Sequence, residues 1–279
     1  MLIKLLQDQF LTQLTPIYDA MEAQQLFLFC LEELEGKTRI DLVMQPDLTT
    51  AQPEAWSNVL TALCDQKPIQ HIFNKAYFYG YTFKVNEYTL IPRPETEELV
   101  EWIIASVPQD QPVRILDIGT GSGCIGLTLA KELPHSQVTL LDISAEALAV
   151  AKENAAALGV TVTFMQQDIL ALTTLTTTYD VIVSNPPYIR QLEKVEIKKN
   201  VMDYEPHTAL FVEDGDPLIF YRKIAQLAYA NLGPQGQLFY EINQYLGPEM
   251  VELLTSIGFS QTVLRQDLLQ NDRMTKSII

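Results

Sequence analysis

Cysteine and histidine are scarce in this chain of 279 residues, which contains three of each. The cysteines, Cys30, Cys64 and Cys124, are odd in number and widely spaced along the sequence. This pattern predicts neither a disulfide framework nor a zinc site. We therefore expect three reduced, buried thiols and no bound metal.

Basic side chains are also few, since 19 lysines and arginines stand against 35 acidic residues, for a formal net charge of −16. Sequence-independent affinity for DNA or RNA depends on lysine and arginine side chains that neutralise phosphates. The charge balance therefore argues against direct nucleic-acid binding. It favours a protein or a small molecule as the partner.

Long apolar runs are absent as well, because no stretch approaches the ~20 residues that a helix needs to cross a bilayer. The N-terminus, MLIKLLQDQF, is interrupted by Lys4 and Asp8, and no small-residue cleavage site follows it. We therefore expect no signal peptide, no membrane association and a cytoplasmic location.

The hydrophobic residues, 47% of the chain, follow patterns that divide it into three parts. Residues 1–75 have apolar positions at helical spacing and predict a small helical domain with no chemistry of its own. Residues 76–91 are rich in aromatic and β-branched side chains, with turn residues at Gly80 and Asn86, and predict a β-hairpin linker. Residues 92–279 would form the domain that carries the chemistry.

Strands and helices alternate in this last part. The expected strands lie at 113–118, 137–142, 160–166, 179–184 and 236–242, and the expected helices at 124–133, 144–158, 218–232 and 248–257. This order predicts a parallel sheet with helices on both faces. Residues 259–265 and 273–279 are too close together for a crossover helix, so we expect them to form an antiparallel hairpin.

One polar tetrapeptide, Asn185-Pro186-Pro187-Tyr188, follows the expected strand at 179–184. Ligands of open α/β sheets bind beyond the carboxyl ends of the strands, which makes the tetrapeptide a candidate site. The prolines have no N–H group and offer carbonyl acceptors at fixed φ angles, and Asn185 adds a side-chain carbonyl. These acceptors, with the ring of Tyr188, could hold an –NH₂ group. A simple strand-ending turn explains the same residues.

A glycine-rich loop, Gly119-Thr120-Gly121-Ser122-Gly123, joins the expected strand at 113–118 to a helix. Its glycines allow the backbone to pass close to a nucleotide-like cofactor. Asp142, at the end of the next strand, could accept hydrogen bonds from ribose hydroxyls.

Two cofactors compete for this loop. Gly126 completes a G-x-G-x-x-G pattern from Gly121, which suits the pyrophosphate of NAD. Asp117 and Asp168 place carboxylates beside the loop, however, where they would repel a pyrophosphate but attract a sulfonium and an adenine amino group. S-adenosylmethionine therefore fits better than NAD.

The segment Pro92-Arg93-Pro94-Glu95-Thr96 leads into a helix with acidic residues in its first turn. Its two prolines stiffen a loop that presents Arg93. These residues fit a binding site and fit equally well a capped helix start after a linker.

These segments together resemble the class I S-adenosylmethionine-dependent methyltransferases, and within them the release factor glutamine methyltransferase family. The resemblance covers nearly the whole chain and is carried by QHIFNKAYFYG, LIPRPETEELV, ILDIGTGSGCIGL, LDISAEALAVAKENA, VSNPPYI, YEPHTAL and QDLLQNDR. It implies a seven-stranded Rossmann-like α/β sheet with an antiparallel C-terminal hairpin, preceded by a helical substrate-recognition domain at residues 1–75 and a β-hairpin linker. It also implies methyl transfer from S-adenosylmethionine to the side-chain amide nitrogen (N5) of a glutamine in peptide chain release factors.

The resemblance further implies residue roles. Residues 119–123 and Asp117 would lie at the methionine part of the cofactor, Asp142 would hold the ribose, and Asp168 with Ile169 would flank the adenine. Residues 185–188 would bind the glutamine amide and carry catalysis, with Asn185 also at the cofactor, while Arg93, Glu95 and Thr96 would close the pocket.

Three positions depart from the family pattern. Asn74 and Asn243 stand where glycine is usual, and Ile169 replaces an aromatic residue found in some members. The local geometry at Asn243 stays open from the sequence, and Ile169 would weaken adenine stacking.

The three histidines, His71, His135 and His207, are expected to be structural. Direct methyl transfer to an amide nitrogen needs no general base before the methyl group moves, because the product nitrogen sheds its proton readily. His207, in YEPHTAL, is the only histidine that we would test.

Residues 190–200 are unusually basic for this chain and carry Arg190, Lys194, Lys198 and Lys199. At helical spacing the first three share one face. This face could dock the protein substrate, or it could be an ordinary solvated surface.

Two other functions stay open at this point. An amino-group methyltransferase acting on nucleic acid could use the same tetrapeptide, although the net acidity and the lack of a DNA-reading domain oppose it. A non-catalytic binding module with the same fold is the second, and the completeness of the motifs opposes it.

Overall fold

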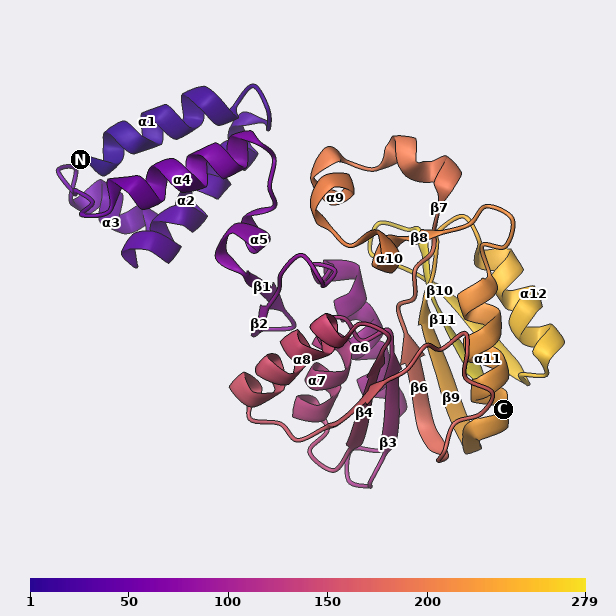
Figure 1. Cartoon of the computed structure of the whole chain (residues 1–279). Coiled ribbons are helices and arrows are strands. Elements are labelled where there is room, and N and C mark those ends of the chain that lie inside the picture. The colour runs from indigo at the N-terminus through magenta and orange to yellow at the C-terminus, as the bar shows by residue number, and fades with distance from the viewer. The chain divides into compact units, whose positions relative to one another are not determined.

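The computed structural model describes residues 1–279 and divides them into two compact units, which Figure 1 displays by element. The smaller unit comprises residues 1–74 and 198–204, and the larger unit comprises residues 75–197 and 205–279. The predicted hairpin segment thus falls in the larger unit. No helix of either unit is both long and apolar enough to span a membrane.

The smaller unit is entirely helical. Its helices are α1 (Ile3–Leu14), α2 (Ala20–Glu35), α3 (Arg39–Met44), α4 (Pro53–Cys64), α5 (Ile69–Phe73) and α9 (Lys199–Tyr204). Phe10, Phe27 and Trp56 are fully buried at its centre, with ring centroids 5.4–5.7 Å apart. Helix α5 is capped at its C-terminus by Asn74, whose φ of 51° is left-handed. Asparagine tolerates this conformation better than most residues, which explains how it can stand where glycine is usual.

The predicted hairpin forms, but it is shorter than expected. Strands β1 (Lys75–Phe78) and β2 (Tyr81–Lys84) pair antiparallel around Tyr79 and Gly80, which both have positive φ. Beyond β2 the chain turns at Asn86, whose carbonyl oxygen accepts a hydrogen bond from the Thr89 N–H at 3.1 Å. Residues 85–91 are therefore a loop, because this turn removes the backbone groups that a longer ladder would need.

The larger unit is built on the seven-stranded sheet that the sequence predicts. Its strands are β3 (Arg114–Ile118), β4 (Gln137–Asp142), β5 (Thr163–Gln166), β6 (Tyr179–Ser184), β9 (Leu232–Glu241), β10 (Gln261–Gln266) and β11 (Asp272–Ile278), in the order β10-β11-β9-β6-β3-β4-β5. Strands β5, β4, β3, β6 and β9 are parallel, whereas β11 pairs antiparallel with both β9 and β10. The predicted fold class, including the antiparallel C-terminal hairpin, is confirmed.

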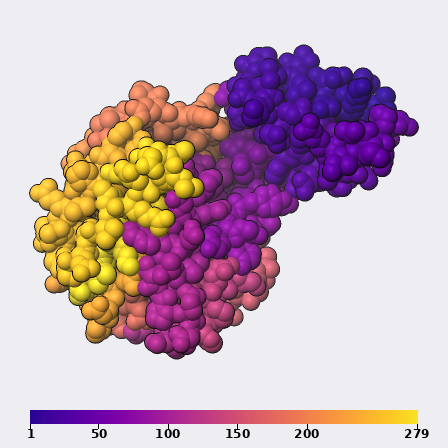
Figure 2. Space-filling model, turned by 180° about the vertical axis from the view of Figure 1, so that it is seen from behind, coloured from indigo at the N-terminus to yellow at the C-terminus, as the bar shows by residue number.

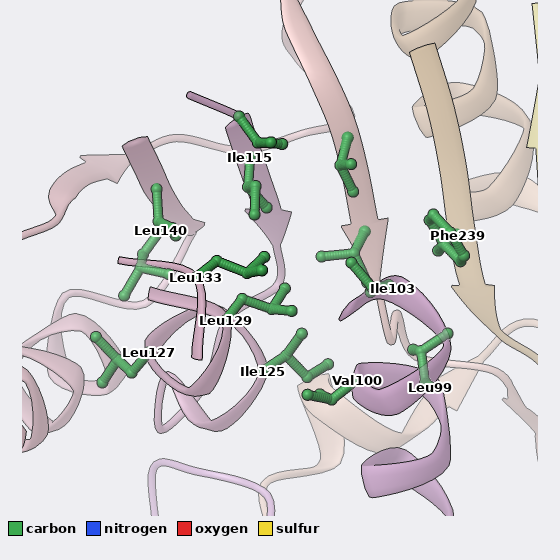
Figure 3. Packing of buried hydrophobic residues seen from close by; sticks show 14 of the residues in the cluster. Leu99, Val100, Ile103, Ile115, Ile125, Leu127, Leu129, Leu133, Leu140 and Phe239 are labelled. Carbon is green, nitrogen blue, oxygen red and sulfur yellow. The ribbon is translucent and has the colours of Figure 1, made fainter. Parts of the chain in front are cut away.

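Helices cover both faces of this sheet. They are α6 (Pro94–Ser106), α7 (Cys124–Glu132) and α8 (Ala145–Leu158) on one face, and α11 (Ile219–Asn231) and α12 (Gly247–Ile257) on the other. Side chains alternate along each strand, so Ile115 packs towards the first group and Leu116 towards the second. Figure 3 shows residues of α6 and α7 packed against the first face. Burial on both faces explains the nearly continuous hydrophobic runs in the sequence.

The C-terminal strands lie beside α6. The Lys276 ammonium donates to Ser106 Oγ at 3.1 Å, and the Leu268 N–H donates to Glu98 Oε1 at 3.2 Å. Figure 2 shows this yellow C-terminal region next to the magenta surface of the larger unit. The hairpin thus extends the sheet and also holds the helix that follows the Pro92–Arg93 loop.

The strand order reverses between β3 and β6. From β3 the chain adds β4 and β5 on one side, and it then returns to place β6 on the other side of β3. Such a switch point opens a crevice at the carboxyl ends of the two strands, where open α/β sheets bind ligands. The glycine-rich loop follows β3, and the tetrapeptide 185–188 follows β6.

Residues 190–200 do not form the single helix that the spacing of their basic residues predicts. Arg190 lies in β7 (Ile189–Arg190), which pairs with β8 (Phe211–Val212), and a 3₁₀ helix, η1 (Gln191–Glu196), follows it. Lys198 and Lys199 belong to the smaller unit. The predicted basic face shared by Arg190, Lys194 and Lys198 is therefore wrong.

Candidate active site

A cavity of about 430 Å³ opens at the carboxyl ends of β3, β4, β5 and β6. It is lined by residues 118–122, 141–144, 167–170 and 184–187, together with Pro92, Arg93 and Thr96 and side chains from residues 208–224. Both candidate sites, the glycine-rich loop and the tetrapeptide, thus border one cavity. Their backbones approach closely, because a Cβ atom on Gly119 would lie 4.0 Å from the carbonyl oxygen of Asn185.

The glycine-rich loop is held in a conformation that its sequence requires. Gly119, Gly121 and Gly123 all have positive φ, between 56° and 83°. The N–H groups of Gly119 and Thr120 both donate to the carbonyl oxygen of Leu141, at 2.8 and 3.1 Å. The loop is therefore fixed to the end of β4, and side chains larger than glycine would be strained there.

Asp117 supports this loop from beneath and does not line the cavity. The side chain is fully buried, and its Oδ2 accepts hydrogen bonds from Thr120 Oγ1 at 2.6 Å and from the Gly126 N–H at 3.0 Å. Gly126 permits this approach, since a Cβ atom there would lie 2.9 Å from Asp117 Oδ2 and 2.2 Å from Leu140 Cδ2. Burial raises the pKa of Asp117 to about 6, against the hydrogen bonds that lower it. The sequence predicted Asp117 at the cofactor, whereas in the structure it lies behind the loop.

Replacing Asp117 with asparagine is expected to stabilise the protein above about pH 6. Asp117 has a pKa of about 6 in the folded protein and 3.8 in the unfolded chain. Between these pH values only the folded protein keeps the proton, so stability falls as the pH rises from 3.8 to about 6. The penalty reaches about 3 kcal/mol. An asparagine keeps one oxygen for both donors and carries no charge. Burying its NH₂ group has a cost, so the net gain in the free energy of unfolding should be about 1–2 kcal/mol. Urea unfolding between pH 4 and pH 8 measures it.

The exposed carboxylate Asp110 provides the control, because Asp110→Asn should shift the curve by less than about 0.5 kcal/mol at every pH. A variant Asp117→Asn that is less stable than the unaltered protein across the whole pH range would refute the buried charge as the cause.

Asp142 borders the cavity at the end of β4. Its Oδ2 accepts a hydrogen bond from the Gly121 N–H at 2.8 Å, and its Oδ1 accepts one from the Ser144 N–H at 2.9 Å. Burial raises the pKa of Asp142, and these N–H groups act in the opposite direction. A carboxylate has about four acceptor sites, so Asp142 retains lone pairs for a ligand hydroxyl.

The loop after β5 brings Asp168 and Ile169 to the same cavity. Asp168 Oδ1 accepts a hydrogen bond from the Leu170 N–H at 2.9 Å, which leaves its second oxygen available. Ile143 lies on the adjoining wall, with 60% of its surface exposed. Sequence reasoning did not single out Ile143, although its position directly after Asp142 was a usable signal.

The tetrapeptide contributes three of its four residues to the cavity. Asn185, Pro186 and Pro187 line it, and the preceding Ser184 Oγ donates to the carbonyl oxygen of Ile118 at 2.7 Å. Tyr188 does not line it. Its hydroxyl donates to Glu241 Oε1 at 3.2 Å. The side chain therefore holds the segment in place, whereas the sequence predicted that its ring would pack against an amide.

The Pro92–Arg93 segment forms another wall. Arg93 and Thr96 line the cavity, whereas Glu95 does not. The Arg93 guanidinium pairs with the buried carboxylate of Glu205 at 2.6 Å, and Thr96 Oγ1 donates to Glu241 Oε2 at 2.6 Å. Sequence reasoning missed both glutamates, and Glu205 could have been found from its place in YEPHTAL.

Apolar side chains complete the cavity and were also missed. They come from segments far apart in the sequence, namely Tyr88, Leu90, Ala209, Phe211, Phe220 and Ile224. Such residues are indistinguishable in sequence from ordinary core positions, so only the fold reveals them. Among the histidines, His207 lies with its ring 5.3 Å from that of Phe211.

Comparison with known proteins agrees with this architecture. The family model "Methyltransferase small domain" matches residues 99–210. Among solved structures, a methyltransferase from Pyrococcus furiosus covers 80% of this chain and 98% of its own length, with a TM-score of 0.52 and 17% identity. This level of identity supports the fold alone.

Curated relatives are much more similar. A release factor glutamine methyltransferase from Flavobacterium psychrophilum is 52% identical over 99% of both chains. One from Bacteroides thetaiotaomicron is 41% identical over 94% of both chains. With identity of this extent, and with a glycine-rich loop and an Asn-Pro-Pro-Tyr segment bordering one cavity, the chain belongs to the release factor glutamine methyltransferase family.

Proposed function

We propose that this methyltransferase uses S-adenosylmethionine to methylate the side-chain amide nitrogen, N5, of a glutamine in peptide chain release factors. The observation that carries the proposal is the shared cavity, which Asn185 and Pro186 line together with the glycine-rich loop. The 52% identity to a relative of that name over the full chain supports the choice of substrate.

The residues of the cavity fit this cofactor. Its volume of about 430 Å³ is within the usual range for small-molecule sites. Asp142 would accept hydrogen bonds from the ribose hydroxyls, Asp168 from the adenine amino group, and Ile143 with Ile169 would pack against the adenine ring. The backbone of residues 119–122 would border the methionine part. When bound, the cofactor supplies an electrophilic methyl group on a sulfonium.

The tetrapeptide would activate the glutamine amide by holding it. An amide nitrogen is a poor nucleophile, because its lone pair is delocalised into the carbonyl group. The side-chain carbonyl of Asn185 and the backbone carbonyl of Pro186 would accept hydrogen bonds from the NH₂ group and stabilise the positive charge that develops on nitrogen. Pro186 and Pro187 have no N–H groups that could compete for these acceptors.

No residue of the cavity is required as a general base. The methylated nitrogen is strongly acidic while it carries the extra proton, and it would release this proton to water when the methylated product leaves the cavity. The apolar walls at Leu90, Phe211 and Phe220 would exclude bulk water from the reacting atoms and strengthen the hydrogen bonds of the tetrapeptide.

The helical unit would recognise the release factor, with the β1–β2 hairpin as its link to the catalytic unit. Helix α3 supports this role, because Ile40, Val43 and Met44 are 73–74% exposed on one short helix. Large apolar side chains gathered at a surface are typical of protein-binding sites. The net charge of −16 supports a protein partner over a nucleic acid, and the reaction would take place in the cytoplasm.

Incubation with methyl-labelled S-adenosylmethionine and purified release factors tests the proposal. We expect label on one glutamine of the release factor, located by peptide mass spectrometry. A release factor in which that glutamine is replaced by glutamate should take up no label. Label on DNA or RNA, or on no macromolecule, would show the proposed function to be wrong.

A further inference from the structure

We infer that Asn243 is a positioning residue for methyl transfer, whose buried side chain fixes the backbone where the chain leaves the tetrapeptide 185–188. This inference rests on the proposed function, since it concerns the same site. Asn243 does not line the cavity, so it would act only through the residues that it holds.

The side chain of Asn243 makes three hydrogen bonds. Its Nδ2 donates to the carbonyl oxygen of Tyr188 at 3.0 Å and to Glu193 Oε2 at 2.9 Å, and its Oδ1 accepts from the Tyr245 N–H at 2.9 Å. Only 4% of the residue is exposed. Both amide donors are therefore used, and they join two segments that are about 50 residues apart in sequence.

The position of Asn243, just after strand β9, explains why its side chain reaches the segment that follows the tetrapeptide. Strands β6 and β9 are parallel neighbours, with Ser184 opposite Tyr240, so the segments after them leave the sheet side by side. The tetrapeptide follows β6, and Asn243 follows β9. A residue without a side-chain amide at position 243 would leave the Tyr188 carbonyl without this donor.

Glu193 holds the amide of Asn243 in its orientation. The carboxylate is buried, and it also accepts hydrogen bonds from the Arg190 N–H at 2.8 Å and from the Arg190 guanidinium at 2.7 Å. These bonds to Arg190 and Asn243 lower the pKa of Glu193 against the effect of burial. The Asn243 donor thus meets a charged acceptor, which makes this bond stronger than one between neutral groups.

Tyr188 is consequently held at two points. Asn243 holds its backbone carbonyl, and Glu241 holds its hydroxyl. The hydroxyl contact fixes only the end of the side chain, so rotation about the side-chain bonds of Tyr188 would still let the main chain move. The carbonyl contact restrains the main chain itself. Because the φ angles of Pro186 and Pro187 are fixed, a displacement at Tyr188 is passed on to these two residues, which line the cavity.

Replacing Asn243 with alanine or aspartate tests the inference. Aspartate has nearly the same size but lacks both donors and places a second carboxylate beside Glu193. We expect kcat to fall about 10- to 100-fold in both variants, because displacements near 1 Å have such effects on well-oriented reactions. The KM for the release factor and the Kd for S-adenosylmethionine should stay within about threefold. Backbone hydrogen exchange of residues 188–193, measured without substrate, should become faster.

Asn231 provides the matched control. It is also buried, and it donates to the carbonyl oxygen of Leu227 at 2.8 Å within α11, away from the cavity. Asn231→Ala should lower stability without changing kcat. The inference is overturned if kcat of both Asn243 variants stays within twofold of the unaltered enzyme, if Asn231→Ala lowers kcat equally, or if cofactor affinity falls in parallel with kcat.

The hydrogen-exchange measurement separates this inference from the proposed function. An unaltered protein that methylates no release factor would overturn the proposed function alone. In that case the exchange rates still decide whether Asn243 fixes the backbone of residues 188–193, since unchanged exchange contradicts this and faster exchange supports it.

Discussion

Replacing Asn185 with alanine is expected to lower kcat about 100- to 1000-fold, the range found when one preorganised hydrogen-bond partner of a transition state is removed. Asn185 borders the cavity at the end of β6, and its side-chain carbonyl is the acceptor that the proposed mechanism uses to stabilise charge on the amide nitrogen. Single-turnover kinetics with a saturating release factor measures the effect. The Kd for S-adenosylmethionine should change less than about fivefold, because Asp142 and the glycine-rich loop are unaltered.

Aspartate at position 185 is the matched control. Asn185→Asp retains an acceptor oxygen of nearly the same reach, so it should keep more activity than Asn185→Ala. An alanine variant that retains more than about one-tenth of the normal kcat would show that Asn185 does not stabilise the transition state in this way.

The sheet could be predicted from sequence because its strands are buried on both faces. The run 179–184 was predicted with the bounds that β6 has in the structure, since Val181, Ile182 and Val183 pack alternately on opposite faces. The short connection before residues 273–279 excluded a crossover helix and correctly predicted the antiparallel end. Hydrophobic runs and connection lengths are properties of short stretches of the chain, so they can be read from the sequence.

Contacts between distant segments could not be read in this way. The spacing of Arg190, Lys194 and Lys198 fits a helix, but β7 pairs with Phe211 and Val212, which lie about 20 residues later. The ring of Tyr188 was predicted to face an amide, but its hydroxyl reaches Glu241, which is 53 residues away. Tertiary partners decide both positions.

The position of Asp117 was open to prediction and was nevertheless missed. Side chains alternate along β3, so Asp117 lies on the same face as Ile115, which packs with α6 and α7. That face lies behind the glycine-rich loop, where Gly126 donates to the carboxylate. Alternation along β3 thus predicts that Asp117 faces α7, and its hydrogen bonds from Thr120 and Gly126 make it a support of the loop.

Asp142 is the last residue of β4 and lines the cavity, which favours a ligand contact. Replacing it with asparagine is expected to weaken the binding of S-adenosylmethionine about 10- to 100-fold, because hydrogen bonds to a charged group contribute about 1.5–3 kcal/mol. The N–H groups of Gly121 and Ser144 donate to different oxygens of the carboxylate. An asparagine has one oxygen, so its NH₂ group must face one of these donors. Calorimetry without release factor measures the loss.

The pH dependence of binding provides a second test of the same carboxylate. Burial raises the pKa of Asp142, and protonation removes an acceptor just as the substitution does. The affinity of the unaltered protein should therefore fall as the pH is lowered towards that pKa, whereas the affinity of Asp142→Asn should change less. Asp180, which accepts the Arg114 N–H at 2.8 Å at the opposite end of the sheet, is the control, and Asp180→Asn should bind normally. If Asp142→Asn binds the cofactor within threefold of the unaltered protein, the ribose is held by other residues, and the loop conformation does not depend on this carboxylate.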